Sequence, residues 1–438
     1  VELTAFLQLA DFEPKMTLFY LMRDINKKLK IVHIGTADTN GGAAKASYAL
    51  HKNLLALGHD SKMLVGYKYS ADPEIEGVWF NRGIIRRGLY HFLVGKLEEW
   101  TGFQYLIQPF RNLFLKHKWV READIIHLHN LHGNFFSYTI FPKLTKIAPT
   151  VWTLYDMWAM SDHCTYPALY GCEIWKTGEG KCPALFDYPP IKRDTGAYLW
   201  KRKKEAYEQS KITVVGPSKW MCEMAEKSPL MKNFDIRYIA QGIDEKLYSP
   251  VNSKDVRREL KIPEEALVVM VTALKNAQRK GLDYFIDSLK YLKTKPRPWL
   301  LVVGNQSLHG LVPPEFKLCE TGYLKSEKLL AKYYSAADIF VLPTLADNLP
   351  LTIMDSLSCG IPVVSFDVGG VKEMVRHMET GYLAKYKDSE DFARGMDLLL
   401  ADAEMRVKMG KRGQEIILNE YTIKRQAENY VRLYEQLI

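Results

Sequence analysis

Long hydrophobic runs are missing from this sequence: no eighteen consecutive residues are apolar, which argues against a membrane-spanning helix. The first twenty residues also lack the basic start and the small-residue cleavage site of a secretion signal. Cysteine is scarce, with six residues in 438, which excludes a small scaffold held together by disulfides. No internal repeat and no low-complexity segment is present. These absences predict a globular protein of the cytoplasm.

The length of 438 residues predicts two or three domains, and 47% apolar with 25% charged residues is typical of globular proteins. The chain begins with Val, and Met16 or Met22 would serve as a natural start. Residues 1–28 are therefore expected to be an N-terminal extension, native or added, outside the folded domains.

The net charge of +9 is unevenly distributed, because residues 81–120 hold seven Lys or Arg against two Glu, among many aromatic and aliphatic residues. One interpretation is an amphipathic helix pair with a solvated basic face. The other is a surface, formed by residues 82–118, that contacts an anionic membrane or a lipid-linked acceptor at the inner face of the cell membrane. A nucleic-acid partner is not expected, since no binding motif accompanies the charge.

Strands and helices alternate along the first half of the chain. A strand over 29–34, a helix over 44–57 and a strand over 61–66 form a βαβ unit. Further elements are expected in the same half: strands over 125–128, 150–154, 212–215 and 236–240, and helices over 86–99, 105–118, 196–209 and 218–227. Residues 160–192 are rich in Pro and Gly and are predicted to be irregular.

A second alternation follows a charged, Pro-bounded stretch over 250–263 that is expected to be the domain hinge. It predicts strands over 267–272, 299–303, 339–342 and 363–366, and helices over 281–292, 327–336, 350–359, 389–401, 403–418 and 422–437. The fold class is therefore α/β, with two Rossmann-like domains, 29–249 and 250–419, that face each other across a cleft. Ligands bind such sheets at the carboxyl ends of their strands.

Two carboxylates flank the predicted start of the helix over 350–359. Asp347 and Asp355 are eight positions apart, and Asn348-Leu349-Pro350 lies between them. A helix N-terminus attracts anions, so one acid at its mouth and one on its flank could hold sugar hydroxyls beside a bound phosphate. The alternative is a surface helix with two solvated acids.

Two short turns could receive a phosphate group. Gly41-Gly42 follows the first strand at the start of a helix, where backbone can approach a ligand closely. Arg279-Lys280-Gly281 places two cations at another helix entrance. Each could instead be a plain solvated turn, and the absence of a G-x-G-x-x-G motif argues against a dinucleotide-dependent dehydrogenase.

Taken in order, these motifs resemble those of the retaining family-4 (group 1) glycosyltransferases of GT-B architecture, in particular a bacterial exopolysaccharide branch. The likeness runs from about residue 30 to residue 430, since further family landmarks follow at 215–220, 242–244, 321–323, 336–338 and 369–371. In such relatives the first domain binds the acceptor, the second binds a nucleotide-sugar donor, and the final helix crosses back onto the first domain, which here implies residues 420–438.

The resemblance assigns roles residue by residue. Lys280, with Arg279, would neutralise the leaving diphosphate, and Asp347 would bind hydroxyls of the donor sugar. Gly42 would border the diphosphate, Gly322 would lie near the base, and Asp355 would bind the ribose. The full set of donor-binding residues implied is Gly41, Gly42, Arg279, Lys280, Gly322, Asn348, Leu349, Pro350, Leu351 and Asp355.

The chain departs from the family pattern at several places. Both acids of the motif are usually Glu, one carbon longer than Asp. Leu274 stands where many members carry an Arg. Tyr155-Asp156 stands where many read His-Asp, and that His usually touches the donor sugar; the catalytic residues implied here are Lys280, Asp347 and Tyr155. Asp156 and His129 are expected on the acceptor side.

Histidine and cysteine form two clusters in the first half. His127, His129 and His132 lie within six residues and are expected to line the cleft or to be hydrogen-bonded in the core, rather than to bind a metal. Cys164, Cys172 and Cys182 resemble a Cys-bearing insertion of the exopolysaccharide branch, in which Glu179 replaces a fourth Cys. Together with His163 they could form a zinc site, a disulfide with one thiol left over, or free thiols.

The expected function is the transfer of a hexose from a UDP- or GDP-sugar to a glycan or lipid-linked saccharide in the synthesis of exopolysaccharide or lipopolysaccharide. No metal or cofactor is required, since cations of the chain and helix ends would stabilise the leaving group. The alternatives are a non-catalytic nucleotide-sugar-binding protein and a sugar-nucleotide epimerase on the same fold.

Overall fold

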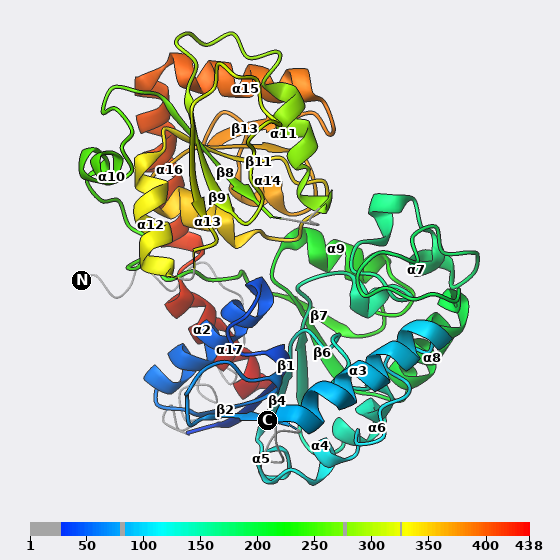
Figure 1. Ribbon diagram of the computed structural model, residues 1–438. Helices are drawn as coiled ribbons and strands as arrows, with labels where there is room; N and C mark the ends of the chain where they lie inside the picture. Colours follow the sequence, from blue (N-terminus) through cyan, green and yellow to red (C-terminus); the bar gives the residue numbers. More distant parts are fainter. Residues whose placement is uncertain (1–27, 79–83, 275–277, 325) are drawn as a thin grey trace, which may run out of the picture.

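The computed structural model describes residues 28–78, 84–274, 278–324 and 326–438. The fold contains two parallel β-sheets, each covered by helices, in two α/β domains that lie one above the other in Figure 1. The predicted fold class, two Rossmann-like domains, is thereby confirmed. The N-terminal extension expected over 1–28 falls, except for its last residue, outside the described residues.

The first domain is built on seven parallel strands in the order β3-β2-β1-β4-β5-β6-β7. Strands of such a sheet are buried on both faces, which explains the apolar runs that identified them in the sequence. Their bounds are β1 Lys30–Ala37, β2 Asp60–Tyr67, β3 Ile75–Gly77, β4 Ile125–Leu128, β5 Thr150–Thr153, β6 Ile212–Gly216 and β7 Asp235–Tyr238.

Helices of the first domain cover both faces of this sheet. They are α2 Gly42–Ala56, α3 Ile84–Thr101, α4 Leu113–Lys116, α5 Lys118–Arg121, α6 Phe141–Leu144, α7 Ile174–Thr177, α8 Gly196–Glu208 and α9 Lys219–Lys227, with short 3₁₀ turns η1 Tyr138–Ile140, η2 Trp158–Met160 and η3 Pro167–Tyr170. The helix predicted over 105–118 is wrong. Tyr105 adopts a left-handed conformation (φ 58°) and Pro109 cannot donate a helical hydrogen bond, so only α4 and α5 form there.

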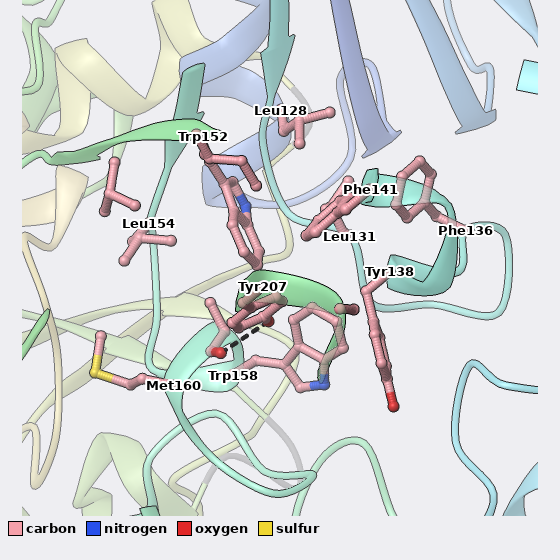
Figure 2. Packing of buried hydrophobic residues seen from close by; sticks show 14 of the residues in the cluster. Leu128, Leu131, Phe136, Tyr138, Phe141, Trp152, Leu154, Trp158, Met160 and Tyr207 are labelled. Carbon is pink, nitrogen blue, oxygen red and sulfur yellow. Dashed lines mark hydrogen bonds between the residues drawn. The ribbon is translucent and has the colours of Figure 1, made fainter. Parts of the chain in front are cut away.

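An aromatic core fills the space beneath the irregular segment between β5 and α8 (Figure 2). Trp152 and Trp158 pack edge-on with ring centroids 6.5 Å apart, and the ring of Tyr207 lies 5.8 Å from Trp152. The hydroxyl of Tyr207 donates to the carbonyl of Ala159 at 3.0 Å. This core fixes a segment that has little regular secondary structure of its own.

The second domain is built on six parallel strands in the order β10-β9-β8-β11-β12-β13. These are β8 Val268–Ala273, β9 Trp299–Gly304, β10 Leu318–Gly322, β11 Ile339–Leu342, β12 Val363–Phe366 and β13 Gly381–Ala384. The sequence did not predict β3, β10 or β13. Each is a short strand at a sheet edge and lacks a full apolar run.

Helices of the second domain match the predicted positions closely, apart from three short elements, α10, η4 and α14. They are α10 Ser253–Glu259, η4 Gln278–Lys280, α11 Leu282–Ser288, α12 Glu327–Ala336, α13 Leu351–Ser358, α14 Val371–Met374, α15 Ser389–Ala401 and α16 Ala403–Glu420. In the part of the chain that the structure describes, no helix combines the length and apolar character needed to cross a bilayer.

The chain crosses between the domains twice, and the two crossing segments bond to each other. The amide of Ile243 donates to the carbonyl of Tyr421 at 2.8 Å, and the amide of Ile423 donates back to Ile243 at 2.9 Å. The second hydrophobic core already includes Ile243, whereas the sequence had put the hinge at 250–263. That stretch instead contains α10, which packs on α12.

The last helix, α17 Ile423–Leu437, belongs to the core of the first domain, where it lies near α2 in Figure 1. Its apolar face packs on residues of α2, β1, β4 and β5. The hydroxyl of Tyr430 is hydrogen-bonded to Thr153 at 2.6 Å, and that of Tyr434 to His127 Nδ1 at 2.7 Å. The last helix therefore packs on the first domain, although it follows the second domain in the sequence.

Candidate functional site

A cleft of about 510 Å³ lies between the two domains, at the carboxyl ends of strands of both sheets. It is lined by ten of the residues singled out from the sequence: Gly42, Tyr155, Asp156, Arg279, Lys280, Asp347, Asn348, Leu349, Pro350 and Leu351. Residues nearly 310 positions apart in the sequence therefore meet at one site.

Gly281 lets the cationic turn, Arg279-Lys280, lie against the acidic loop, which is the loop before α13 that carries Asp347. Gly281 has a φ of 65°, and a Cβ there would lie 1.9 Å from the carbonyl oxygen of Pro343. This close approach brings Lys280 Nζ to 2.5 Å from Asp347 Oδ2, and Arg279 to 3.3 Å from Oδ1. The turn and the loop that precedes α13 thus form one polar unit.

Both cations act on the ionisation of Asp347. Burial by itself would raise the pKa of this carboxyl, but the charges of Lys280 and Arg279 outweigh it and hold the pKa below its ordinary value. The hydroxyl of Thr344 also donates to Asp347 Oδ2 at 3.2 Å. Burial lowers the pKa of Lys280, against the opposing effect of Asp347. Asp347 is therefore a carboxylate placed between two positive charges.

Two helix N-termini open onto the same cleft. Pro350 precedes α13, and Gly41, with φ 101°, precedes α2; neither side chain caps its helix. Leu351 of α13 and Gly42 of α2 line the cleft, one from each domain. The free N–H groups of both first turns, with the two cations, make this end of the cleft suited to a group with several negative charges.

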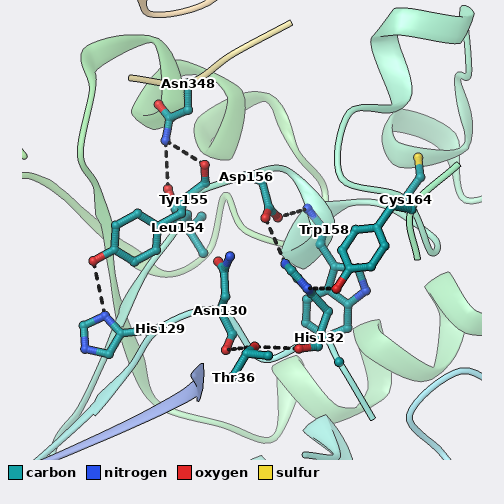
Figure 3. Close-up of polar contacts among 12 residues, drawn as sticks. Thr36, His129, Asn130, His132, Leu154, Tyr155, Asp156, Trp158, Cys164 and Asn348 are labelled. Carbon is teal, nitrogen blue, oxygen red and sulfur yellow. Dashed lines mark hydrogen bonds and ion pairs between the residues drawn. The ribbon is translucent and has the colours of Figure 1, made fainter. Parts of the chain in front are cut away.

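The first domain contributes a hydrogen-bonded trio, Asp156, His132 and Tyr188, of which Figure 3 labels Asp156 and His132. His132 Nε2 lies 3.0 Å from Asp156 Oδ2 and donates to it, and the hydroxyl of Tyr188 lies 3.3 Å from Nδ1 of the same ring. Asp156 was expected on the acceptor side, and His132 was expected to line the cleft or to be hydrogen-bonded in the core; it lines the cleft. Tyr188 was not predicted as a site residue. Nothing in the sequence spacing links the three, because the pairing depends on how the segment after β5 folds back.

His129 is buried beneath the residues of the first domain that line the cleft. Its Nδ1 is 3.3 Å from the hydroxyl of Tyr155, and its Nε2 is 2.9 Å from His33 Nδ1. Burial lowers the pKa of His129 to about 3, so the ring is neutral. Tyr155 lines the cleft, but Figure 3 shows its hydroxyl turned towards His129. His127 has both ring nitrogens engaged, by Thr153 and Tyr434.

Two side chains tie the domains together across the cleft. The amide of Asn348 donates to the carbonyls of Leu154 (3.1 Å) and Tyr155 (3.2 Å), and its oxygen accepts from the hydroxyl of Ser218. The guanidinium of Arg279 lies 4.6 Å from the ring centre of Tyr166. The side chain of Asn348, placed among the donor-binding residues by the sequence, is occupied in joining the domains.

Four predicted site residues lie outside the cleft lining. Gly41 and His129 border an adjoining cavity of about 220 Å³. Gly322 does not line the cleft, but the next residue, Tyr323, does. Asp355 is 5% exposed, on the buried side of α13. Burial, together with the charge of Glu327, raises the pKa of Asp355 well above its ordinary value and favours the uncharged acid. Asp355 is therefore not one of the residues that line the cleft together with Lys280 and Asp347.

Comparison with known families assigns both halves of the chain. Residues 40–247 match the model described as Glycosyltransferase Family 4, and residues 252–416 match the one described as Glycosyl transferases group 1. The chain belongs to the group 1 glycosyltransferases of GT-B fold, and the resemblance noted in the sequence is confirmed.

Individual relatives agree with this assignment. The glycosyl transferase WcaC of Escherichia coli (strain K12), attributed to colanic acid biosynthesis, is 23% identical over 434 residues, which is 93% of this chain and 100% of WcaC. N,N'-diacetylbacillosaminyl-diphospho-undecaprenol alpha-1,3-N-acetylgalactosaminyltransferase of Campylobacter jejuni is 27% identical over 203 residues, 45% of this chain and 53% of that protein. Among solved structures, Anabaena Alr3699/HepE in complex with UDP-glucose superposes with a TM-score of 0.64 at 14% identity, covering 93% of this chain and 100% of that one.

Proposed function

We propose that this protein is a retaining hexosyltransferase that uses a nucleotide-diphosphate sugar and glycosylates a saccharide or lipid-linked saccharide during the assembly of a surface polysaccharide. The observation that carries the proposal is the meeting, in one cleft, of Lys280, Arg279 and two uncapped helix N-termini around Asp347. Such a set of positive groups fits the diphosphate of an activated sugar.

The proposed mechanism follows from the charges that develop on the diphosphate and on the sugar ring during transfer. As the bond between the anomeric carbon and the diphosphate oxygen breaks, negative charge grows on the diphosphate and positive charge on the sugar ring. Lys280 and Arg279 stabilise the former, and the carboxylate of Asp347 holds sugar hydroxyls beside the latter. The acceptor oxygen forms the new bond on the same face, and its proton passes to the departing phosphate oxygen. These groups belong to the chain, so we propose that added divalent metal is not needed for transfer.

The donor is proposed to be a UDP- or GDP-sugar. In support, the structurally similar Anabaena protein has been crystallised with UDP-glucose. The apolar side chain of Leu274, which lines the cleft where many relatives carry Arg, leaves the diphosphate to Lys280 and Arg279. Gly322, beside Tyr323, remains a candidate for contact with the base.

The acceptor side is proposed to be the first domain. Asp156, His132 and Tyr188 offer hydrogen-bonding groups for sugar hydroxyls in the cleft and in the adjoining cavity. Tyr188 also borders a third cavity, of about 230 Å³, which reaches Phe92 and Lys96 of α3. Tyr188 therefore lies between the cleft and a cavity that is lined in part by α3.

The surface of α3 suits a lipid-linked acceptor. Five large apolar side chains of this helix are more than two-fifths exposed: Leu89, Phe92, Leu93, Leu97 and Trp100. Lys96 lies among them and is half exposed, and Lys192 lies 5.0 Å from the ring centre of Trp100. Apolar residues flanked by cations favour the interface of an anionic membrane. We therefore propose a cytoplasmic protein that binds peripherally to the inner face of the cell membrane. The name of the Campylobacter relative, which includes a diphospho-undecaprenol acceptor, is consistent with this.

The test is to incubate the purified protein with UDP-, GDP- and ADP-sugars and to record thermal stability, donor consumption and product. One nucleotide sugar at about 100-fold excess over its Kd should raise the free energy of unfolding by about 2.7 kcal/mol. The same donor should be consumed with retention at the anomeric carbon when a polyprenyl-diphosphate saccharide is supplied.

Other outcomes would favour the two alternatives. Stabilisation by a nucleotide sugar without hydrolysis or transfer to any acceptor would indicate a binding protein. Conversion of one nucleotide sugar into its epimer without an acceptor would indicate an epimerase. Absence of stabilisation by every nucleotide sugar would contradict the site itself.

A further inference from the structure

A buried group of side chains in the first domain has no role in the proposed transfer. It lies in the segment between β5 and α8, where the ligand atoms of Asp162, His163 and Cys182 all lie within 4.8 Å of one another. Asp162 and His163 are fully buried, and Cys182 is half-buried. This combination of oxygen, nitrogen and sulfur donors is one that metal ions use.

The imidazole of His163 is oriented by its surroundings. Its Nδ1 lies 3.1 Å from the carbonyl oxygen of Pro189, which can only accept a hydrogen bond, so Nδ1 carries the proton. The lone pair of a neutral ring is then on Nε2, which lies 3.1 Å from Cys182 Sγ and faces the group. A backbone carbonyl that fixes the tautomer in this way is the usual outer contact of a metal-binding histidine.

Asp162 is fully buried, and neither carboxylate oxygen has a hydrogen-bond partner. Its Oδ2 lies 3.9 Å from His163 Nε2. Gly196 leaves room for this carboxylate, since a Cβ there would lie 2.7 Å from Oδ2. A carboxylate without a hydrogen-bond partner in the interior is costly, and a cation bound by the group would offset that cost.

Two thiols complete the set. The thiol of Cys172 interacts with that of Cys182, although Cys172 is not one of the three ligand atoms already gathered, and all six cysteines of the chain are free. The amide of Ala184 donates to Cys182 Sγ at 3.4 Å, a contact that stabilises a thiolate. We propose that Asp162, His163, Cys172 and Cys182 bind one structural zinc ion. Four donors of types O, N, S and S match the tetrahedral preference of zinc and not the all-oxygen preference of magnesium or calcium.

This set differs from the one indicated by the sequence, Cys164, Cys172, Cys182 and His163. Asp162 takes the place of Cys164. Neither Cys164 nor Cys172 is among the three ligand atoms gathered there, but Cys172 is the thiol that interacts with Cys182.

The zinc ion would hold the wall of the catalytic cleft. Two residues after Cys164, Tyr166 stacks on Arg279, and the amide of Thr165 donates to the carbonyl of Tyr188 at 3.2 Å. Tyr166 and Tyr188 both line the cleft. A cross-link among residues 162, 163, 172 and 182 fixes the segment that carries both rings, which otherwise has only short helices η2, η3 and α7.

The test measures bound metal on the full chain, purified without metal-affinity resin, incubated with equimolar zinc and desalted. The wild-type protein should retain one zinc per chain, and X-ray absorption should give two sulfur neighbours at about 2.3 Å and two nitrogen or oxygen neighbours at about 2.0–2.1 Å. The double variant Cys172→Ser/Cys182→Ser should retain less than about a tenth as much. The matched control, Cys222→Ser/Cys319→Ser, should retain the full amount.

Equal zinc content in the two double variants would overturn the proposal, as would a Cys172–Cys182 disulfide in the wild-type protein mapped under non-reducing conditions. If the first double variant does not fold, the absorption spectrum of the wild-type protein decides: fewer than two sulfur neighbours, or no bound zinc, overturns the assignment. Metal content does not depend on glycosyl transfer, so this result is separate from the proposed function.

Discussion

Lys280 is the residue whose charge acts most directly on the proposed leaving group. Replacement by Ala removes the cation 2.5 Å from Asp347. We expect Lys280→Ala to lower kcat about 10²–10³-fold, or about 3–4 kcal/mol, by analogy with the loss of one preorganised charge-stabilising donor. Donor consumption in the presence of acceptor measures this effect, and circular dichroism checks that the fold is retained.

The control for this substitution is Lys290→Ala, which removes a largely exposed lysine paired with Asp287 on the surface of the same domain. Its activity should match that of the wild-type protein. Unchanged turnover in Lys280→Ala would remove Lys280 from the catalytic machinery.

Glu98 gives the protein a pH-dependent stability. It is 2% exposed, and burial raises its pKa from 4.5 to about 8. The folded state therefore binds a proton that the unfolded state has already released, and stability falls as the pH rises from about 4.5 to about 8. We expect Glu98→Gln to remove this slope and to raise the free energy of unfolding above pH 8 by about 1–3 kcal/mol.

Chemical denaturation at several pH values measures the effect. The control is Glu99→Gln, whose more exposed carboxylate pairs with Lys96 at 2.7 Å and should leave the slope in place. Identical pH profiles for Glu98→Gln and the wild-type protein would contradict the assignment of the slope to this carboxyl.

At the scale of single residues, the sequence could indicate groups carried by short motifs. Lys280, beside Gly281, and Asp347, before a helix start, occupy such motifs, and the structure places them 2.5 Å apart. His132 could not be found as a partner of Asp156, because their contact depends on a long irregular segment. The burial of Asp355 could not be predicted from the motif, because it depends on which elements pack against that side of α13; its role in donor binding stays a prediction.

At the scale of elements, the turn between β8 and α11 depends on Gly281. A side chain there meets the carbonyl of Pro343 at 1.9 Å, so Gly281→Ala must push the cationic turn away from the acidic loop. We expect this variant to lose more than 2 kcal/mol of stability and at least tenfold in kcat/KM, since misplacement of catalytic groups by about 1 Å is costly.

The variant Gly310→Ala is the control for Gly281→Ala, because it introduces backbone strain without a steric clash. Gly310 has a similar φ of 74°, but a Cβ there would meet nothing within 4 Å. Its cost should be limited to about 1–2 kcal/mol of conformational strain, with kcat/KM unchanged. Equal losses of activity in the two variants would show that the contact with Pro343 does not position the turn.

The exposed face of α3 predicts membrane binding. Phe92→Ser/Leu93→Ser removes two side chains that are 61% and 56% exposed and therefore should not disturb packing. Sedimentation with vesicles that contain anionic lipid should recover wild-type protein and at least tenfold less of this variant, because each exposed apolar chain contributes about 1 kcal/mol or more at the interface.

The matched control removes two equally exposed apolar residues from the other domain, Val407→Ser/Leu418→Ser on α16, which are 73% and 58% exposed. It should sediment like the wild-type protein. Equal sedimentation of all three proteins, or equal binding to neutral vesicles, would contradict a specific role for α3.

At the scale of the whole molecule, the two-domain α/β architecture could be predicted because buried parallel strands leave continuous apolar runs and the helices between them keep a helical period. The position of the hinge could not. Residues 250–263 have the composition of a linker, yet Arg257 donates to the carbonyl of Ala336 at 2.9 Å and pairs with Asp338, which anchors α10 in the second domain. The true crossings look unremarkable in sequence because their pairing is long-range.

The two segments that cross between the domains lie side by side and form one paired connection. Gly242 lets the two segments touch, since a Cβ there would lie 2.6 Å from Ile423 Cα, and its amide donates to the side chain of Gln426 at 3.1 Å. Two backbone segments that are hydrogen-bonded side by side resist sliding past each other. We therefore expect the two domains to move relative to each other mainly by rotation about these segments, so that the cleft between the domains widens on the side away from them.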